Sequence, residues 1–364
     1  MKSQTGNTPL RGSAVGLFLY DVCEEIKLDE LRSLLGARRL GEGLKHAAAE
    51  QIYFERPPVV EHISAPTTPG AGKLQAEVKY YDYGVISVVF EFPFVGNWDD
   101  LISLSSRWLS GTEFESYARK IAQHQAERAV SALVKPYPQY LNEDYFVFFL
   151  REVGGNPSAA QLLTSCGQQI AQVVRGENAA LAESERNEVL QSAMSYYPND
   201  LVVVGWNAAF VYDSVAGAET VMQLLEYSNS QLLEFRHYDD LLTRELEAVY
   251  DSLGRRGSVL NRWRLPQEAS RLQTVLLEVG ELTERVDNAI KFLSDMFAAR
   301  LYRLAASKVG VTDYKNLVKE KLRTSAELYR FMIDQFHQSR NFVLELAIVV
   351  ILVIELIYAF QGRF

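Results

Sequence analysis

The chain has 364 residues, of which 48% are hydrophobic and 23% are charged. This composition is typical of a folded globular protein with two or three domains, and it excludes a mainly disordered chain. A net charge of -9 argues against a protein that coats nucleic acid. The two cysteines, Cys23 and Cys166, are too few for a disulfide framework or a multi-cysteine metal site, and they favour a reducing compartment.

The N-terminal part of the chain predicts alternating strands and helices. Residues 1–13 are polar and predict a flexible start, whereas "AVGLFLYDV" (14–22) predicts a buried strand. Acidic residues follow this run and no small-residue cleavage site is present, so it is not a signal peptide. Leucines at helical spacing in "LDELRSLLGARRL" then predict a helix. The β-branched and aromatic residues on both sides of Asp82-Tyr83-Gly84 predict a hairpin.

A helical stretch follows the hairpin from Asp99 to about Leu133, with one break at Ser110-Gly111, and "DYFVFFLREV" supplies another strand. The order strand, helix, strand, strand, helix, strand is that of a ferredoxin-like α+β sandwich. The remaining predicted elements of this part are helices at 157–175 and 182–195, one strand in "DLVVVGWNAAFVYD" and a long helix from about 218 to 253.

Apolar residues at three- and four-residue steps continue from Pro266 onward and predict a long helical hairpin. Its helices join at Gly310, which would place Phe342 level with about Glu278 and bend the first helix near Gly280. The predicted organisation is a flexible N-terminus (1–13), an α+β head domain (14–213), a helix with an arginine-rich connector (214–265), a hairpin stalk (266–340) and a transmembrane anchor (341–364).

The last apolar run, "LELAIVVILVIELIYAF", is close to a membrane span. A helix over 342–360 would be roughly 28 Å long, near the thickness of the hydrocarbon core. Its apolar side chains favour insertion by roughly 4 to 8 kcal/mol, and two central carboxylates would oppose it by about 5 to 7 kcal/mol. Neither glutamate is central, which lowers that penalty. The alternative is a buried helix of a soluble oligomer. The residues assigned to the anchor are Phe342, Glu345, Ile351, Glu355 and Phe360.

An arginine cluster precedes the predicted hairpin. The segment "RRGSVLNRWR" places Arg255, Arg256, Arg262 and Arg264 around Trp263. In an acidic protein this cluster suits anionic lipid headgroups, and tryptophan suits the membrane interface. A solvated interhelical loop and a contact with RNA are the alternatives.

The sequence contains no Walker loop, dinucleotide glycine fingerprint, HExxH or nucleophile elbow. "GARRLGEGLK" follows a helix rather than a strand, which disfavours a phosphate cradle, and the five histidines are scattered. We therefore predict no catalytic residue, no metal and no cofactor.

Two further segments are candidates for a ligand site. We interpret "LLEYSNSQLLEFRHYDDLLTRELE" as a helix with an acidic, solvated side and leucines packed inward, and a carboxylate site is the alternative. Its titratable residues include Glu226, Glu234, His237, Asp239 and Asp240. In "VVVGWNAAFVYD" we interpret Trp206, Asn207 and Asp213 as parts of a structural strand with a capping aspartate, and a ligand pocket is the alternative.

Leu344-Glu345 and Ile354-Glu355 place two glutamates ten residues apart, after the segment "LYRLAASKVGVTDYKNLVKEKLRTSAELYRFMIDQFHQSRNFVLE". In this pattern the final hundred residues resemble the YagE/Rmd family, the "required for meiotic nuclear division" group. The resemblance implies an α+β domain on a helical stalk with a C-terminal anchor, and mitochondrial relatives that support organelle translation. The resemblance assigns a catalytic role to no residue of this chain.

The sequence thus predicts a non-enzymatic, tail-anchored membrane protein with a cytoplasmic head. It would act as a homo-oligomeric scaffold or tether that organises a cytoplasmic protein or ribonucleoprotein partner at the lipid bilayer. One alternative is an oligomeric channel or transporter component that uses Glu355, and another is an unrecognised hydrolase.

Overall fold

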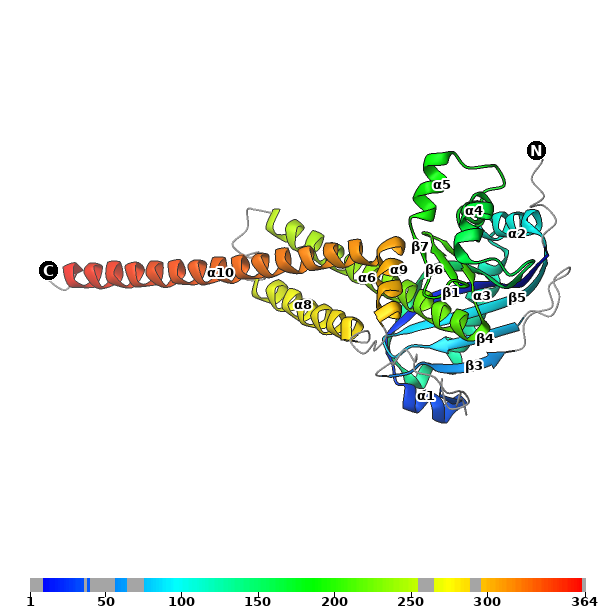
Figure 1. Ribbon diagram of the computed structural model, residues 1–364. Coiled ribbons are helices and arrows are strands. Elements are labelled where there is room, and N and C mark those ends of the chain that lie inside the picture. The colour runs from blue at the N-terminus through cyan, green and yellow to red at the C-terminus, as the bar shows by residue number, and fades with distance from the viewer. Residues whose placement is uncertain are drawn as a thin grey trace. The chain divides into compact units, whose positions relative to one another are not determined.

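The structure is a computed structural model that describes residues 9–35, 38–39, 56–63, 75–254, 265–288 and 296–361. The chain divides into two compact units, whose elements are labelled in Figure 1. Unit 1 consists of Met1–Arg236 and Arg285–Tyr314, and unit 2 consists of His237–Glu284 and Lys315–Phe364.

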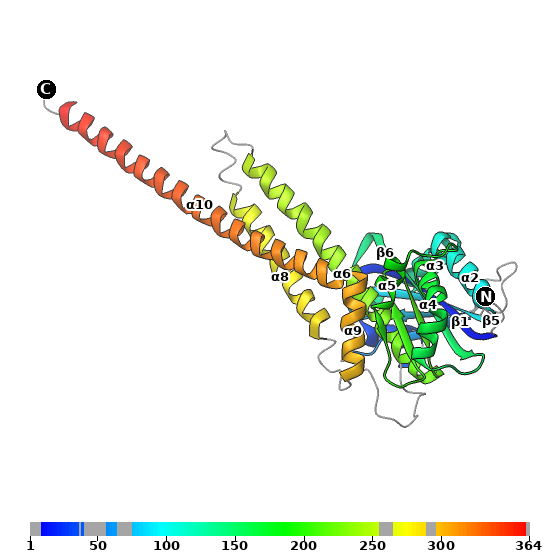
Figure 2. The same cartoon turned by 45° about the horizontal axis from the view of Figure 1, so that its top comes forward.

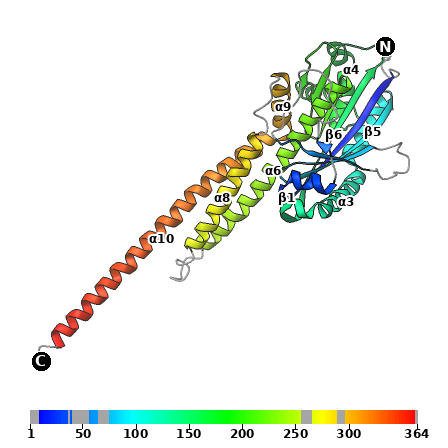
Figure 3. The same cartoon turned by 90° about the horizontal axis from the view of Figure 1, so that it is seen from below.

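Unit 1 is built on one mixed sheet. In the described residues this sheet has nine strands in the order β2-β3-β4-β5-β1-β6-β9-β8-β7. The strands β6 and β9 are parallel, and the other described neighbours are antiparallel. The long strands β6, β1 and β5 run side by side in Figure 3. The bounds are β1 Leu10–Ile26, β2 Arg38–Arg39, β3 Val59–Ile63, β4 Gln75–Tyr80, β5 Val85–Gly96, β6 Leu133–Val153, β7 Ala193–Met194, β8 Leu201–Val204 and β9 Ala208–Tyr212.

The predicted mixture of helices and strands is confirmed, but this sheet has more strands than a ferredoxin-like sandwich contains. Strands β2 and β3 extend it at one edge, and β9, β8 and β7 extend it at the other. The predicted single strand in "DLVVVGWNAAFVYD" is two strands, because the chain reverses at Gly205, whose N–H donates to the Ala208 carbonyl oxygen (2.8 Å). Strand β1 begins at Leu10, inside the segment predicted to be flexible.

The helices of unit 1 that precede α6 begin and end close to their predicted positions. Helix α2 begins where the Asn97 side chain accepts hydrogen bonds from the N–H groups of Asp99 and Asp100. It ends at Ser110, before Gly111, which confirms the predicted break. The bounds are α1 Leu28–Leu35, α2 Trp98–Ser110, α3 Glu113–Arg128, α4 Ala159–Arg175, α5 Glu183–Leu190 and α9 Met296–Val309. Helix α6 spans Val215–Gly254, and its part up to Arg236 belongs to unit 1.

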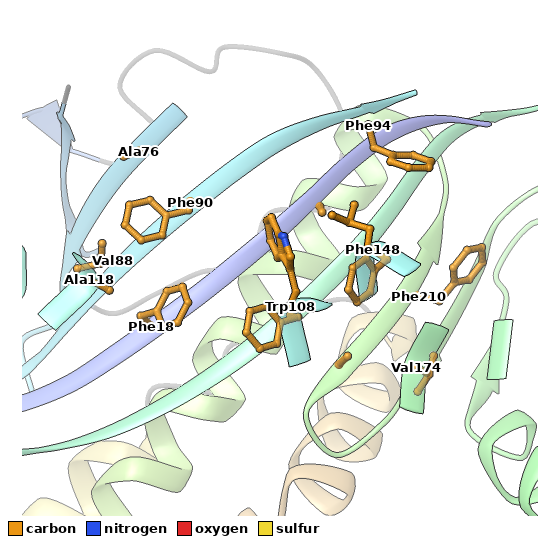
Figure 4. Packing of buried hydrophobic residues seen from close by; sticks show 14 of the residues in the cluster. Phe18, Ala76, Val88, Phe90, Phe94, Trp108, Ala118, Phe148, Val174 and Phe210 are labelled. Atoms are coloured by element: carbon orange, nitrogen blue, oxygen red, sulfur yellow. The ribbon is translucent and has the colours of Figure 1, made fainter. Parts of the chain in front are cut away.

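Side chains of the sheet alternate between two buried faces, as the two-residue period of a strand requires. On one face, Phe18, Phe90 and Phe148 belong to a hydrophobic core that includes α2, α3 and α4 (Figure 4). Trp108 from α2 lies 6.0 Å from the Phe146 ring, centroid to centroid. The next residues along each strand point to the opposite face, and they include Leu17, Leu19, Val147 and Val211, which are also buried. Helix α9, which is labelled in Figure 2, packs near β8, the neighbour of the edge strand β7.

Unit 2 contains the part of α6 after Arg236, most of α8 (Leu265–Asn288) and most of α10 (Val311–Gln361). Val318, Ser325 and Met332 are buried at seven-residue steps on α10, which is the spacing of a coiled-coil seam. The predicted hairpin register is wrong. The Tyr329 hydroxyl donates to Gln273 Oε1 (3.2 Å), so the position level with Glu278 lies before Tyr329 and not at Phe342. The reason is that α9, which was predicted as part of the stalk, is a separate helix of unit 1.

Candidate functional site

A polar segment of α6 is buried against the sheet within unit 1. Every residue from 224 to 235 is buried, although a surface helix would bury only one stripe. The sheet covers one side of this segment, and α9 covers another side through the Tyr302 hydroxyl, which donates to Gln231 Oε1. We call residues 226–236 of α6, together with the side chains that they contact, the polar interface. Its polar groups must be satisfied inside the protein.

One end of the polar interface is a buried ion pair. Lys79 Nζ on β4 lies 2.6 Å from Glu226 Oε2 and 3.1 Å from Glu77 Oε1. Burial lowers the pKa of Lys79, but the Glu226 and Glu77 carboxylates outweigh it and raise that pKa above its usual range. Lys79 is therefore charged at neutral pH, and it fixes α6 to the sheet electrostatically.

Tyrosines surround this ion pair. The Tyr83 hydroxyl and Ser230 Oγ are 2.7 Å apart and share a hydrogen bond between the β4–β5 turn and α6. Tyr81 stacks on Tyr83 with ring centroids 5.3 Å apart. Burial, and then the neighbouring Glu226 carboxylate, raises the pKa of Tyr81 well above its usual value. These hydroxyls remain protonated and act as hydrogen-bond donors.

The β4–β5 turn is held tightly against β1. Gly84 has φ +97°, and a Cβ at this position would lie 1.8 Å from the Cys23 carbonyl oxygen. The Gly84 carbonyl accepts from Val22 N–H (3.1 Å), and the Asp82 carbonyl accepts from Ile26 N–H (2.9 Å). Only glycine fits this position, because it combines a left-handed backbone with a close approach of two chains.

The other end of the polar interface is a second ion pair, between Arg236 of α6 and Glu143 of β6. Burial raises the pKa of Glu143, and Arg236 partly offsets this effect. Asp21 of β1 and Glu234 of α6 are also buried near this end, at 1% and 3% exposure. Both carboxyls interact electrostatically with the Cys23 thiol and with the Tyr137 hydroxyl.

The two ion pairs define the direction of α6. Lys79 pairs with Ser87, Ser87 pairs with Leu19, and Leu19 pairs with Glu143 across the sheet. This row crosses four strands and is about 14 Å long at a strand spacing of about 4.8 Å. The rise from Glu226 to Arg236 along a helix is about 15 Å. Helix α6 therefore crosses the strands nearly at right angles. At one end the helix supplies the negative partner of the ion pair, Glu226, and at the other end it supplies the positive partner, Arg236.

The predicted solvated position of Glu226 and Glu234 is wrong, because both side chains are buried, at 1% and 3% exposure, and Glu226 pairs with Lys79 of the sheet. The structure does not gather the acidic residues of this segment into one site either. Glu226 and Glu234 lie at different ends of the polar interface, and Asp239, which belongs to unit 2, pairs with Lys321 at 2.6 Å. The prediction missed Lys79 and Glu143, which lie in strands without any local chemical motif, and it treated Tyr83 only as part of the hairpin turn.

The other sequence candidates lie apart from the polar interface. Trp206 is 63% exposed at the β8–β9 turn, and the Asp213 carboxylate accepts from the N–H of Ser214, just before α6 begins. Among the described residues, no group of three His, Cys, Asp or Glu side chains is placed to hold a metal ion. The arginine cluster lies outside the described residues; its members are Arg255, Arg256, Arg262, Trp263 and Arg264.

The residues assigned to the anchor all lie in α10. Phe342, Glu345, Ile351 and Glu355 are exposed, and Phe360 lies near the end of the same helix. Within the described part of the chain, α10 is the one helix that is long and apolar enough to cross a membrane.

Comparison with known proteins gives a match in the N-terminal half. Residues 11–219 match the family described as "Uncharacterized protein MJ0711, N-terminal domain". The protein MJ0711 of Methanocaldococcus jannaschii is 20% identical to the chain over 190 residues, which are 52% of this chain and 58% of that protein. The chain thus matches little more than half the length of this curated relative. No solved structure matches the chain.

The resemblance to the YagE/Rmd family is wrong. It rested mainly on the last hundred residues, whereas the family match covers 11–219. An apolar helix with two glutamates has too few distinctive positions to identify a family, because many membrane-like helices share that composition. The chain belongs to the family of the MJ0711 N-terminal domain.

Proposed function

We propose that the chain is a membrane protein in which α10 is embedded in a lipid bilayer and holds an MJ0711-type domain at the membrane surface. In this proposal the protein is a non-enzymatic, oligomeric scaffold or tether for a cytoplasmic protein or ribonucleoprotein. The observation that carries the proposal is the exposure of α10 on all of its faces from 342 to 358.

The exposure pattern changes along α10. Up to Met332 the helix buries one side chain in every seven against its neighbours in unit 2. From Phe342 to Tyr358, each described leucine, isoleucine and valine is at least 44% exposed, and none of the apolar window is buried. Water opposes such exposure at about 25 cal/mol per Å² of apolar surface. A bilayer removes this cost, and the helix satisfies its own backbone groups there.

Glu355 supports the oligomeric part of the proposal. It is surrounded along the helix by Ile354 and Leu356, and a carboxylate at membrane depth is costly unless it is protonated or paired. Polar side chains in spanning helices associate by hydrogen bonds between helices. A second copy of α10 offers the same carboxyl group at the same depth. Arginines of the segment 255–264 would contact anionic headgroups.

Charge substitution in the span tests the anchor. Ile351→Arg with Val353→Arg adds about 5 to 7 kcal/mol to the cost of insertion, so the protein should no longer float with liposomes. Leu277→Arg is the matched control, since Leu277 is 67% exposed on α8, and this variant should still float. Continued membrane association of the double variant, with unchanged circular dichroism, would overturn the anchor.

Two variants of Glu355 test the oligomer separately. Glu355→Gln keeps a hydrogen-bonding side chain and should keep the oligomer in detergent. Glu355→Leu removes that group and should shift the sedimentation of the protein to the monomer. An unchanged oligomer in Glu355→Leu would remove the role of Glu355 without affecting the anchor. Capture of partners with membrane-extracted protein then tests the scaffold, which predicts that a specific protein or ribonucleoprotein co-purifies.

A further inference from the structure

A surface of exposed aromatic and apolar side chains lies where α9 passes the loop between β7 and β8, within unit 1. Tyr196 and Tyr197 of the loop are 57% and 58% exposed, and Met296 at the start of α9 is 74% exposed. The Tyr196 ring lies 4.7 Å from the Tyr197 ring and 5.2 Å from the Phe297 ring of α9, centroid to centroid. The loop and the helix therefore form one continuous surface.

The loop is held in place by a buried carboxylate. Asp200, which is 8% exposed, accepts hydrogen bonds from the backbone N–H groups of Tyr196 and Tyr197, at 2.7 Å each. The backbone that carries the two tyrosines is thus fixed, while their side chains stay exposed. Tyrosine, methionine and arginine are enriched at protein–protein interfaces, and a surface that is already ordered loses less entropy when it binds.

Helix α9 adds two arginines to this surface. Met296, Arg300 and Arg303 are exposed and follow one another by four and three residues, so they lie on one face of the helix, within about 60°. In the part of the chain that the structure describes, neither arginine has an ion pair, whereas Lys308 of α9 lies 3.0 Å from Glu188. The α9 surface consists of Tyr196, Tyr197, Met296, Arg300 and Arg303.

The exposed side of α8 carries the complementary pattern. Leu277, Glu281 and Glu284 are exposed and follow one another by the same steps of four and three residues, and we call them the α8 stripe. Each of the two patterns rises about 10 Å along its helix. Two parallel helices would therefore bring the apolar residues together and place each glutamate opposite an arginine.

We propose that the α8 stripe of one copy of the chain docks on the α9 surface of another copy, with the two helices parallel. Leu277 contacts Met296 and the two tyrosines, and the glutamates pair with the arginines. This contact rests on the oligomer of the proposed function and adds a second interface to it. The second copy is the favoured occupant, because it supplies one apolar and two acidic side chains in the order that the α9 surface requires.

The docking is weak between free copies of the chain. Exposed ion pairs contribute little affinity, but opposite charges align two surfaces, and like charges exclude a wrong alignment. Association of the α10 helices raises the effective concentration of one copy around another. The contact therefore forms in the assembled oligomer, and it is lost when Glu355→Leu separates the copies.

Cross-linking of the full chain in detergent tests the contact directly. One variant carries Met296→Cys, and a second, with a longer tag, carries Leu277→Cys; the native Cys23 and Cys166 are both buried. Oxidation of the mixed oligomer with copper phenanthroline should join the two variants. Because neither chain holds both new cysteines, this link forms only between copies. Trp206→Cys is the matched control in place of Met296→Cys, since Trp206 is 63% exposed at another turn of unit 1, and it should not cross-link.

Charge reversal tests the alignment. Arg300→Glu with Arg303→Glu in the Met296→Cys chain places like charges opposite each other, and should slow cross-linking at least about tenfold. Glu281→Arg with Glu284→Arg in the other chain alone should slow it in the same way. When both chains carry their reversals, the charges are complementary again and the rate should recover. A mixture that does not recover would overturn the proposed pairing.

Sedimentation of the same samples separates the two proposals. An oligomer of normal size that gives no cross-link between Met296→Cys and Leu277→Cys would overturn this contact and leave the association of α10 intact. The α9 surface would then belong to an acidic segment of another protein. A wild-type chain that sediments as a monomer would overturn both this contact and the oligomer of the proposed function.

Discussion

Lys79 on β4 and Glu226 on α6 form a salt bridge of 2.6 Å in which the side chains are only 11% and 1% exposed. Such a pair gains Coulomb energy in a site of low dielectric constant, but each partner has lost its hydration. Removal of one partner therefore leaves an unpaired buried charge, and this lowers the free energy of unfolding more than removal of both partners does. This asymmetry makes the pair a sensitive test of how α6 is attached to the sheet.

Lys79→Met should lower the free energy of unfolding by about 3 to 5 kcal/mol, because Glu226 then stays buried without its cation. The double variant Lys79→Met with Glu226→Leu should recover most of this loss. Denaturant unfolding of unit 1, followed by circular dichroism, measures both. Equal destabilisation of the single and double variants would contradict the buried charge as the cause.

Gly84→Ala should be strongly destabilising. A non-glycine residue at a positive φ costs about 1 to 3 kcal/mol, and the new Cβ would also meet the Cys23 carbonyl oxygen at 1.8 Å. Gly155 is the matched control, since it has φ +87° and nothing lies within 4 Å of a Cβ there. Gly155→Ala should therefore lose only the stability that a non-glycine residue costs at a positive φ. The difference in unfolding midpoint between the two variants then measures the effect of the contact between the new Cβ and β1.

Trp108→Ala should lower the free energy of unfolding by about 3 to 5 kcal/mol, as expected for a large core side chain that leaves a cavity. Its ring lies 5.0 Å from Phe114 and 6.0 Å from Phe146, centroid to centroid. Trp206 is 63% exposed, and Trp206→Ala should change stability by no more than about 0.5 kcal/mol. Thermal unfolding followed by circular dichroism distinguishes them, and a large effect of Trp206→Ala would be inconsistent with an exposed turn.

Tyr83→Phe should cost about 0.5 to 1.5 kcal/mol, the net contribution of one hydrogen bond. The change removes the contact with Ser230 Oγ, while that hydroxyl keeps its bond to the Tyr227 carbonyl oxygen (2.8 Å). Tyr196→Phe is the control at a side chain that is 57% exposed. If the two variants lose the same stability, the link between the β4–β5 turn and α6 does not stabilise the fold.

Cys23 should be slow to react with alkylating agents in the folded chain. Burial is the main cause that raises the pKa of its thiol, to about 12, so the reactive thiolate forms in the folded state only as the pH approaches that value. In the unfolded chain the thiol ionises near its ordinary pKa of about 8.5. Addition of denaturant at about pH 8 should therefore speed the reaction sharply. Fast modification without denaturant would contradict the buried position.

Local signals in the sequence were sufficient for several elements. The β4–β5 hairpin follows from Asp82-Tyr83-Gly84 between two β-rich runs, and the end of α2 follows from Gly111. Both depend on residues a few positions apart. The two strands β8 and β9 were read as one, because Gly205 lies in a continuous apolar run.

The polar interface could not be predicted in the same way. The spacing of leucines on α6 is equally consistent with a half-exposed helix. The burial of Glu226 depends on Lys79 of β4, which lies 147 residues earlier in the chain. The partners Lys79 and Glu143 come from strands that carry no motif of their own. Burial of a charge is a property of tertiary packing, and a local pattern does not encode it.

The two-part composition of unit 1 has a consequence for its biosynthesis. The family match ends at residue 219, whereas the unit continues to Arg236 and is completed by Arg285–Tyr314. During translation the sheet is made first, but Tyr302, which contacts Gln231, is made only after α8. The side of α6 that Tyr302 contacts must therefore stay uncovered while more than sixty further residues, counted from Arg236 to Tyr302, are added. A chaperone or the ribosome surface has that interval in which to hold it.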